Sequence, residues 1–196
     1  MLSQLVSLQG GYPFRAGIQP RTGGSVLAVQ MRDLQPDQPV DWDKAVRTEL
    51  EGRREADWLR DGDVLVVAKG TRYFATCLSG VPDNTVSSPH MYVLRVKAPD
   101  RLFPEFLAWQ INQRPAQQYL AQAAVGTNQL SIRRAALESM ALAVPSIEQQ
   151  QKVLRIAALA RAERATLEKL IQNRQRQLDA IARQLLIPNQ AEPIGR

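Results

Sequence analysis

Three short segments of the sequence combine cationic side chains with amide, hydroxyl or aromatic side chains. They are Gly11–Gly24 (GYPFRAGIQPRTGG), Lys69–Phe74 (KGTRYF) and Gly126–Arg134 (GTNQLSIRR). Arginine can bind guanine through two hydrogen bonds, asparagine and glutamine can bind adenine, and lysine can bind phosphate. The candidate DNA-contacting side chains are Tyr12, Arg15, Gln19, Arg21, Lys69, Arg72, Tyr73, Thr127, Asn128, Gln129, Arg133 and Arg134. The alternative for each segment is an ordinary solvated loop, and only their joint occurrence favours binding.

Residue types that carry catalysis are scarce. The chain has one cysteine, Cys77, and one histidine, His90, so neither a disulfide nor a metal cluster built on these residue types is expected. Cys77 lies in the apolar run FATCL, which favours a buried thiol over a nucleophile. Glycine-rich nucleotide-binding patterns, a G-x-S-x-G elbow and the N/D-P-P-Y/F loop of amino-group DNA methylases do not occur. We therefore expect a binding protein rather than an enzyme, without cofactor or metal.

The overall composition is that of a soluble globular protein. Of 196 residues, 44% are hydrophobic and 22% are charged. The net charge of +6 is compatible with binding nucleic acid but does not establish it. No apolar stretch approaches the ~18 residues of a membrane span, and the N-terminus lacks the regions of a signal peptide. The expected location is the cytoplasm.

Short strands are expected to position the first two segments. Four apolar runs are bounded by glycine, proline, aspartate or serine, at Ser25–Met31, Asp63–Gly70, Phe74–Leu78 and Met91–Val96. The charged stretch Asp33–Arg60 between the first two runs reads as mostly irregular.

Helices are expected around the third segment. Pro104 suits the first position of a helix PEFLAWQINQ, and Pro115 suits that of a second helix, PAQQYLAQAA, which Gly126 would end. Ser131 could cap a third helix, SIRRAALESM, and the run ALAVP that Pro145 ends resembles a strand.

A long helix is predicted over Ile147–Leu186, which contains neither proline nor glycine. Ser146 and Gln149 fit a capping box, and Glu148 suits the positive end of the helix dipole. A coiled-coil seam follows a 4,3 spacing: Val153, Ala157, Ala160, Arg164, Leu167, Ile171, Arg174, Leu178, Ile181 and Leu185. The helix would be about 60 Å long. A compact domain of this size measures about 30–40 Å, so a partner helix is favoured over a helix folded back on its own domain.

The order of these features resembles the specificity (S) subunits of type I restriction–modification systems. A segment of the form L-x-P-x-F-L, a Gly-Thr loop and a Pro-x-x-E-Q helix start follow one another, as in the second half of a target-recognition domain of that family. The matching residues are Leu102, Pro104, Phe106, Leu107, Gly126, Thr127, Pro145, Glu148 and Gln149. Upstream, GYPF at 11–14 and GDVLVVAKG at 62–70 resemble earlier parts of that domain.

The resemblance implies a fold and a task. The fold would be a target-recognition domain of class α/β (α+β) over 1–145 with a twisted, partly barrel-like sheet, a spacer and dimerisation helix over 146–187, and a flexible tail over 188–196. The task would be non-catalytic, sequence-specific recognition of double-stranded DNA for a methyltransferase (M) subunit, with or without a restriction (R) subunit, in phage defence.

S subunits of this family typically have two recognition domains and two helices, whereas this chain has one of each and resembles a half-length S subunit. It would form a homodimer, or pair with another half-subunit, through its helix. A coiled-coil adaptor without sequence-specific DNA binding remains the alternative.

Overall fold

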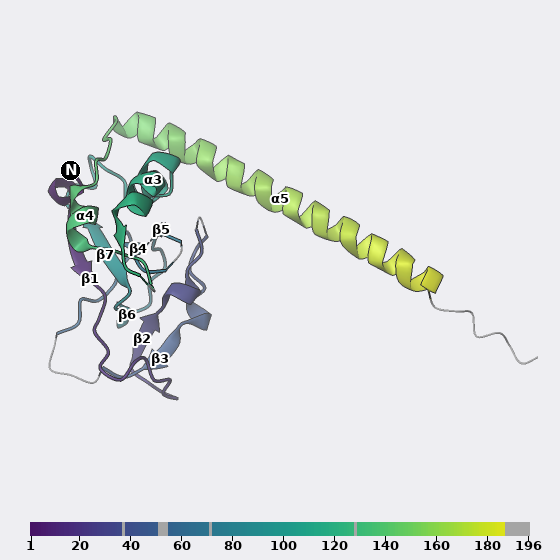
Figure 1. Cartoon of the computed structure of the whole chain (residues 1–196), viewed down its shortest axis with the longest axis horizontal. Coiled ribbons are helices and arrows are strands. Elements are labelled where there is room, and N and C mark those ends of the chain that lie inside the picture. Colours follow the sequence, from purple (N-terminus) through teal and green to yellow (C-terminus); the bar gives the residue numbers. More distant parts are fainter. Residues whose placement is uncertain (37, 51–54, 71, 128, 187–196) are drawn as a thin grey trace, which may run out of the picture. The chain divides into compact units, whose positions relative to one another are not determined.

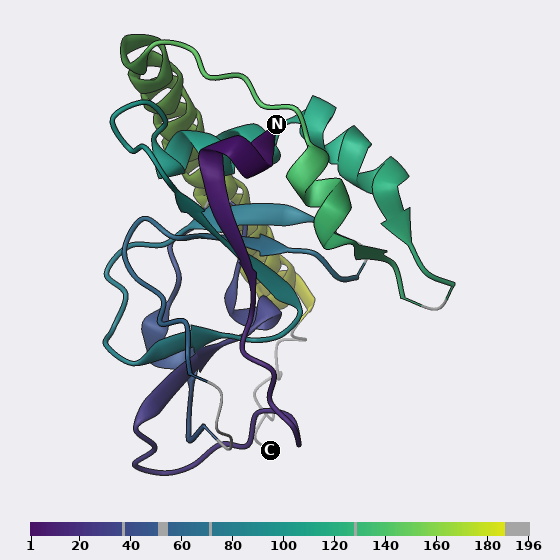
Figure 2. The same ribbon diagram turned by 90° about the vertical axis from the view of Figure 1, so that its left-hand side faces the viewer.

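The computed structural model describes residues 1–36, 38–50, 55–70, 72–127 and 129–186. The chain divides into two compact units, Met1–Leu154 and Arg155–Arg196. Within the first unit, helices α3 (Arg114–Ala123) and α4 (Arg134–Ser139) lie at the end away from strands β2 (Val26–Val29) and β3 (Val46–Thr48) (Figures 1 and 2). The predicted tail at 188–196 lies outside the described residues.

A four-stranded antiparallel sheet forms the centre of the first unit. Its strands, in spatial order, are β1 (Val6–Gly10), β7 (Met91–Val96), β4 (Val64–Val67) and β5 (Phe74–Cys77). Strand β4 is buried on both faces because its side chains alternate between two clusters. Val64 and Val66 pack with helix α2 (Pro104–Ile111), whereas Leu65 and Val67 pack on the opposite face with Leu34 among others.

A three-stranded sheet and a small hairpin complete the strands. The strand order of the second sheet is β3 (Val46–Thr48), β2 (Val26–Val29) and β6 (Thr85–Ser87), with β2 antiparallel to β3 and parallel to β6. Strands β8 (Ala124–Val125) and β9 (Ser131–Ile132) form the hairpin. The mixed α/β class predicted from the sequence is confirmed.

The prediction of a partly barrel-like sheet was wrong. The sheets are open and have edge strands. Strand β5 is an edge of the central sheet, and the amide of Asn112 occupies this edge. Asn112 Oδ1 accepts a hydrogen bond from the Ala75 N–H (2.8 Å), and Asn112 Nδ2 donates one to the Ala75 carbonyl (2.9 Å). A side chain thus satisfies the backbone groups that a further strand would pair in a closed barrel.

The four strands predicted between residues 25 and 96 are present as β2, β4, β5 and β7, within the limits expected. The strands that the sequence did not predict are short: β1, β3, β6, β8 and β9. Their lengths range from two to five residues. Partners distant in sequence hold some of them. Strand β1, for example, pairs with β7 from Val6↔Val96 to Gly10↔Tyr92. The local sequence of a short strand does not indicate which distant strand it pairs with.

The helices between the sheets follow the prolines. Helix α2 begins at Pro104, and α3 (Arg114–Ala123) has Pro115 in its first turn. A short α1 (Leu2–Leu5) at the N-terminus was not predicted.

Three local predictions in this region were wrong. Helix α3 ends at Ala123, one residue before the predicted end, but Gly126 does not end it as a C-terminal glycine, because the chain enters β8 at Ala124. Ser131 lies in β9 and does not cap α4 (Arg134–Ser139), whose N-cap residue is Arg133. The run 141–145 is not a strand, because the Ala143 N–H and carbonyl bond the side-chain amide of Gln110 (2.7 and 3.0 Å).

A buried ion pair connects the turn before β4 to β7. The guanidinium of Arg95 donates two hydrogen bonds of 2.7 Å to the two carboxylate oxygens of Asp63, and a third of 3.1 Å to Asp57. The Asp63 side chain is only 1% exposed. Asp63 therefore has a structural role in positioning the start of β4, the strand that leads into Lys69.

Helix α5 spans Ile147–Leu186, as predicted. The capping box is confirmed: the Ser146 N–H donates to Gln149 Oε1 (3.2 Å), and the Gln149 N–H donates to Ser146 Oγ (3.3 Å). Within the first unit, Val153 and Leu154 pack against the core.

Candidate nucleic-acid interface

Two of the three candidate segments lie side by side. The β8–β9 hairpin attaches to the end of β4, where Lys69 and Ser131 form an isolated antiparallel bridge. On either side of it, the Gly70 N–H donates to the Leu130 carbonyl (2.9 Å) and the Ile132 N–H donates to the Ala68 carbonyl (2.8 Å). Figure 2 shows the hairpin extending from α3 and returning to α4. Segments separated by some 60 positions in sequence are therefore joined through their backbones.

The core beneath the hairpin holds it in place. The Tyr92 hydroxyl donates to the Ile132 carbonyl (3.2 Å), and the Tyr119 hydroxyl donates to the Ala136 carbonyl (2.8 Å). At the hairpin turn, Gly126 has φ +135°, and an added Cβ would overlap the carbonyl oxygen of Gln129. Only glycine suits this position. Gly126, one of the residues on which the family resemblance rests, therefore sets the shape of the loop.

Cationic and polar side chains are exposed on these two segments. Arg72, Thr127, Gln129 and Arg133 are exposed, and Lys69 is half-buried. Arg134 forms an ion pair with Glu138 (2.8 Å), which partly neutralises it. The candidate Asn128 lies outside the described residues. The exposed guanidinium groups of Arg72 and Arg133 have no ion-pair partner among the described residues, so their donors are available to an anion or a base edge.

The two candidate tyrosines contribute to the core rather than to the surface. Tyr12 and Tyr73 are each 8% exposed. The ring of Tyr12 packs edge-on against Phe14 with centroids 5.0 Å apart, and Tyr73 belongs to the large core cluster. In this conformation neither ring can stack on a base, so both residues position their loops.

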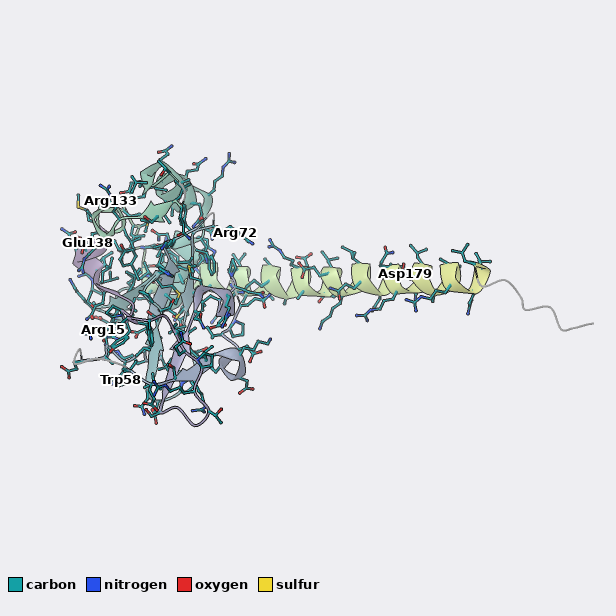
Figure 3. All side chains as sticks on the ribbon, turned by 60° about the horizontal axis from the view of Figure 1, so that its bottom comes forward. Arg15, Trp58, Arg72, Arg133, Glu138 and Asp179 are labelled. Carbon is teal, nitrogen blue, oxygen red and sulfur yellow. The ribbon has the colours of Figure 1, made fainter. Side chains whose placement is uncertain are left out.

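The first segment lies beside the three-stranded sheet and bonds to its strand β3. The Arg21 N–H donates to the Arg47 carbonyl (2.9 Å), and the Thr48 hydroxyl donates to the Gln19 carbonyl (2.7 Å). Gln19 Nε2 donates to the nearby Ala16 carbonyl (3.1 Å). Arg15 is exposed and appears on the same side of the view as Arg133, with Arg72 on the other side (Figure 3). Arg47 was not among the candidates from the sequence. It lies beside this segment because it is part of β3, which pairs with β2.

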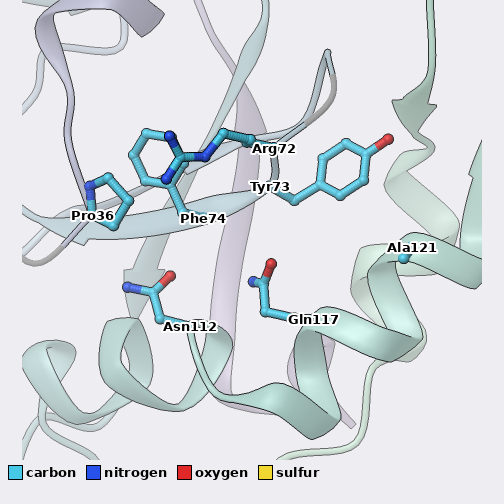
Figure 4. A pocket seen from close by; sticks show the side chains of 7 residues that line it. All are labelled: Pro36, Arg72, Tyr73, Phe74, Asn112, Gln117 and Ala121. Carbon is cyan, nitrogen blue, oxygen red and sulfur yellow. The ribbon is translucent and has the colours of Figure 1, made fainter.

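A cavity of about 350 Å³ lies beside Arg72, between the start of β5 and the α2–α3 junction (Figure 4). Arg72 and Phe74 line one side, and Asn112 and Gln117 line the other. Gln117 Nε2 donates to the Ile111 carbonyl (2.8 Å), and the Asn112 amide binds β5. No local motif marks these two amides, because a tertiary contact brings them to the cavity.

The thiol of Cys77 is half-buried. Burial, together with the smaller effect of the nearby carboxylates of Glu105, Asp63 and Asp61, raises its pKa to about 12. Such a thiol is protonated at neutral pH and is a poor nucleophile. Within the described part of the chain, no group of three or more His, Cys, Asp or Glu residues is placed to hold a metal ion.

No family model matches the sequence, and no curated protein does. Two solved structures share the fold. The S subunit of the type I restriction–modification system from M. genitalium aligns with a TM-score of 0.56 and 16% identity, over 97% of this chain and 46% of that one. A structure concerning complex assembly and conformational transition of the type I R–M system aligns with a TM-score of 0.64 and 14% identity, over 92% of this chain and 42% of that one.

The expected resemblance to type I S subunits is thereby confirmed at the level of the fold. This chain spans less than half the length of either matched chain. None of the helices in the described ranges combines the length and apolarity that crossing a membrane requires.

Proposed function

We propose that this protein is the non-catalytic DNA-specificity subunit of a type I restriction–modification methyltransferase complex. The observation that carries the proposal is the fold match, which covers nearly the whole chain and less than half of a type I S subunit. The joined basic loops at Lys69–Tyr73 and Gly126–Arg134 support it, because exposed arginines on a rigid support suit base and phosphate contacts.

The chain pairs with a second copy of itself through α5. Apolar seam residues on this helix are exposed to water in the single chain: Leu167 52%, Ile171 68%, Leu178 60%, Ile181 52% and Leu185 79%. Burying such side chains against a partner helix is favourable by roughly 1.5–3 kcal/mol each when burial is complete. Val153 already packs on its own domain, so the interhelix contact is centred on the seam beyond Arg155.

A homodimer would bring two identical recognition domains to inverted half-sites, because a two-fold axis in the protein is matched by one in the DNA. Apolar residues away from the seam, Ile156, Leu159 and Leu170, are 67%, 71% and 55% exposed. They supply a second surface, which we assign to the M subunit.

The function is tested by measuring binding to duplex DNA as a function of salt, with the M subunit present. For a specificity subunit, the logarithm of the binding constant falls linearly with the logarithm of the salt concentration. The complex also binds the duplex that it methylates more tightly than an unrelated duplex. A coiled-coil adaptor gives neither. Metal-dependent or S-adenosylmethionine-dependent activity of the purified chain alone would contradict the proposal.

A further inference from the structure

The turn at Ser88–His90 lies between two of the candidate DNA-binding segments. The Ala68 N–H, next to Lys69, donates to the His90 carbonyl (3.4 Å). On the other side, Gly11 approaches so closely that an added Cβ would overlap the Ser88 carbonyl oxygen. The turn therefore contacts both the start of the first segment and the residue that precedes the second.

A cavity of about 470 Å³ opens beside this turn. Phe14, Ile18 and Met31 supply apolar surface, and Arg32 and His90 supply N–H donors. Its lining thus complements the two parts of a nucleotide: the apolar side chains can pack on the sugar and the face of the base, and the N–H donors can bind the anionic phosphate.

The donors of Arg32 and His90 are available. The Arg32 side chain is 70% exposed, and its Nε is 3.8 Å from the nearest Asp33 oxygen, beyond hydrogen-bonding distance. Asp33 also accepts the Gln30 N–H (2.8 Å). The exposed imidazole of His90 has no hydrogen-bond partner within the part of the chain that the structure describes.

The electrostatic environment of His90 favours an anion. Partial burial lowers the His90 pKa below its usual value, and the positive charge of Lys69 lowers it further. Lys69 on the β4–β5 loop and Arg32 on η1 (Met31–Asp33) are cationic, and Asp33 beside Arg32 is the opposing charge. A bound phosphate would offset the repulsion by Lys69 and stabilise the imidazolium.

We propose that this cavity binds one nucleotide of the DNA strand, with its phosphate at Arg32 and His90 and its sugar and base face against Phe14 and Ile18. The inference rests on the proposed function and extends the contact surface beyond the three loops. It makes the Ser88–His90 turn the bridge between the first segment and Lys69.

His90 provides a direct test because it is the only histidine in the chain. The full chain, labelled in histidine and assembled with its M subunit, is titrated by NMR from pH 5 to 8.5 with and without the duplex that the complex methylates. We expect DNA to raise the His90 pKa, and binding by the complex to tighten from pH 8 to pH 6. In His90→Gln the tightening should be reduced.

Arg32→Ala should reduce the slope of the logarithmic salt dependence by about 1, as expected for one lost phosphate contact. Arg101→Ala, which removes an exposed arginine outside these segments, is the charge-matched control. Thermal melting establishes that both variants fold.

DNA binding with an unchanged His90 pKa and an unchanged Arg32→Ala salt slope would overturn this inference and leave the proposed function intact. A wild-type complex that binds no DNA would overturn both.

Discussion

Arg72 and Arg133 are exposed guanidinium groups on two segments that backbone hydrogen bonds join. Their own donors are unpaired within the described chain, whereas Arg134 is engaged by Glu138. Among the candidates on these two segments, Arg72 and Arg133 are therefore the side chains best able to bind a guanine edge.

Replacing Arg72 or Arg133 by alanine should weaken specific DNA binding by roughly 1–3 kcal/mol if the side chain contacts a base edge. Competition between the target and single-base variants, measured by fluorescence anisotropy with the M subunit, would show relaxed specificity at one position. Arg101→Ala provides the control. Unchanged affinity and specificity in both variants would remove these loops from the interface.

Cys77 should react slowly in the native protein. Because its pKa is raised to about 12, almost no thiolate is present at pH 8, and burial restricts access to the sulfur. A thiol reagent should modify it much faster in guanidinium than in buffer, and the native rate should keep rising as the pH is raised above 9. Rapid native modification at pH 7 would contradict this assignment.

The first turns of α5 are attached to the domain by the buried amide of Gln150 as well as by the packing of Val153 and Leu154. Gln150 is fully buried. Its Oε1 accepts the Phe103 N–H (2.9 Å), and its Nε2 donates to the Arg101 and Pro145 carbonyls (2.8 and 2.9 Å). The same side chain thus connects the helix to the segment before α2.

Gln150→Ala should lower the free energy of unfolding by roughly 2–4 kcal/mol, because it leaves buried backbone groups without partners. The neighbouring exposed residue offers a matched control, and Gln151→Ala should change stability by no more than about 0.5 kcal/mol. Urea denaturation followed by circular dichroism measures both. Equal stability of the two variants would show that this amide does not attach the helix.

At the scale of the whole molecule, the protein is expected to act as a pair of chains. The single chain matches less than half of a type I S subunit, and the seam of α5 is exposed when the chain is alone. In the proposed function, a second copy would cover that seam and supply the second recognition domain.

Ile171→Glu combined with Leu178→Glu should convert the protein to a monomer of 21.9 kDa, because like charges would face each other across a buried seam. The matched control adds the same charge outside the seam, in Gln172→Glu with Ala180→Glu, and should stay dimeric. Light scattering measures both masses. A wild-type chain that is monomeric with and without the M subunit would contradict the half-subunit proposal.

The features that depend on neighbouring residues could be predicted from the amino-acid sequence. Helix α5 and its cap follow from Ser146, Gln149 and forty residues without proline or glycine, because capping and helix propagation depend on near neighbours. The prolines likewise mark the first turns of α2 and α3. The strand runs around β4 and β7 were found because apolar, β-branched residues bounded by turns are a local pattern.

The contacts between distant segments, in contrast, follow from how the chain packs in three dimensions. The joining of Lys69 to Ser131 and the cavity beside His90 depend on partners separated by tens of residues. Strand β5 is an edge strand whose backbone is bonded by the side chain of Asn112. Tyr12 and Tyr73 are buried by packing against other parts of the fold. These contacts could not be predicted, because hydrogen bonds and burial between remote segments produce no recognisable pattern in the sequence of either segment alone.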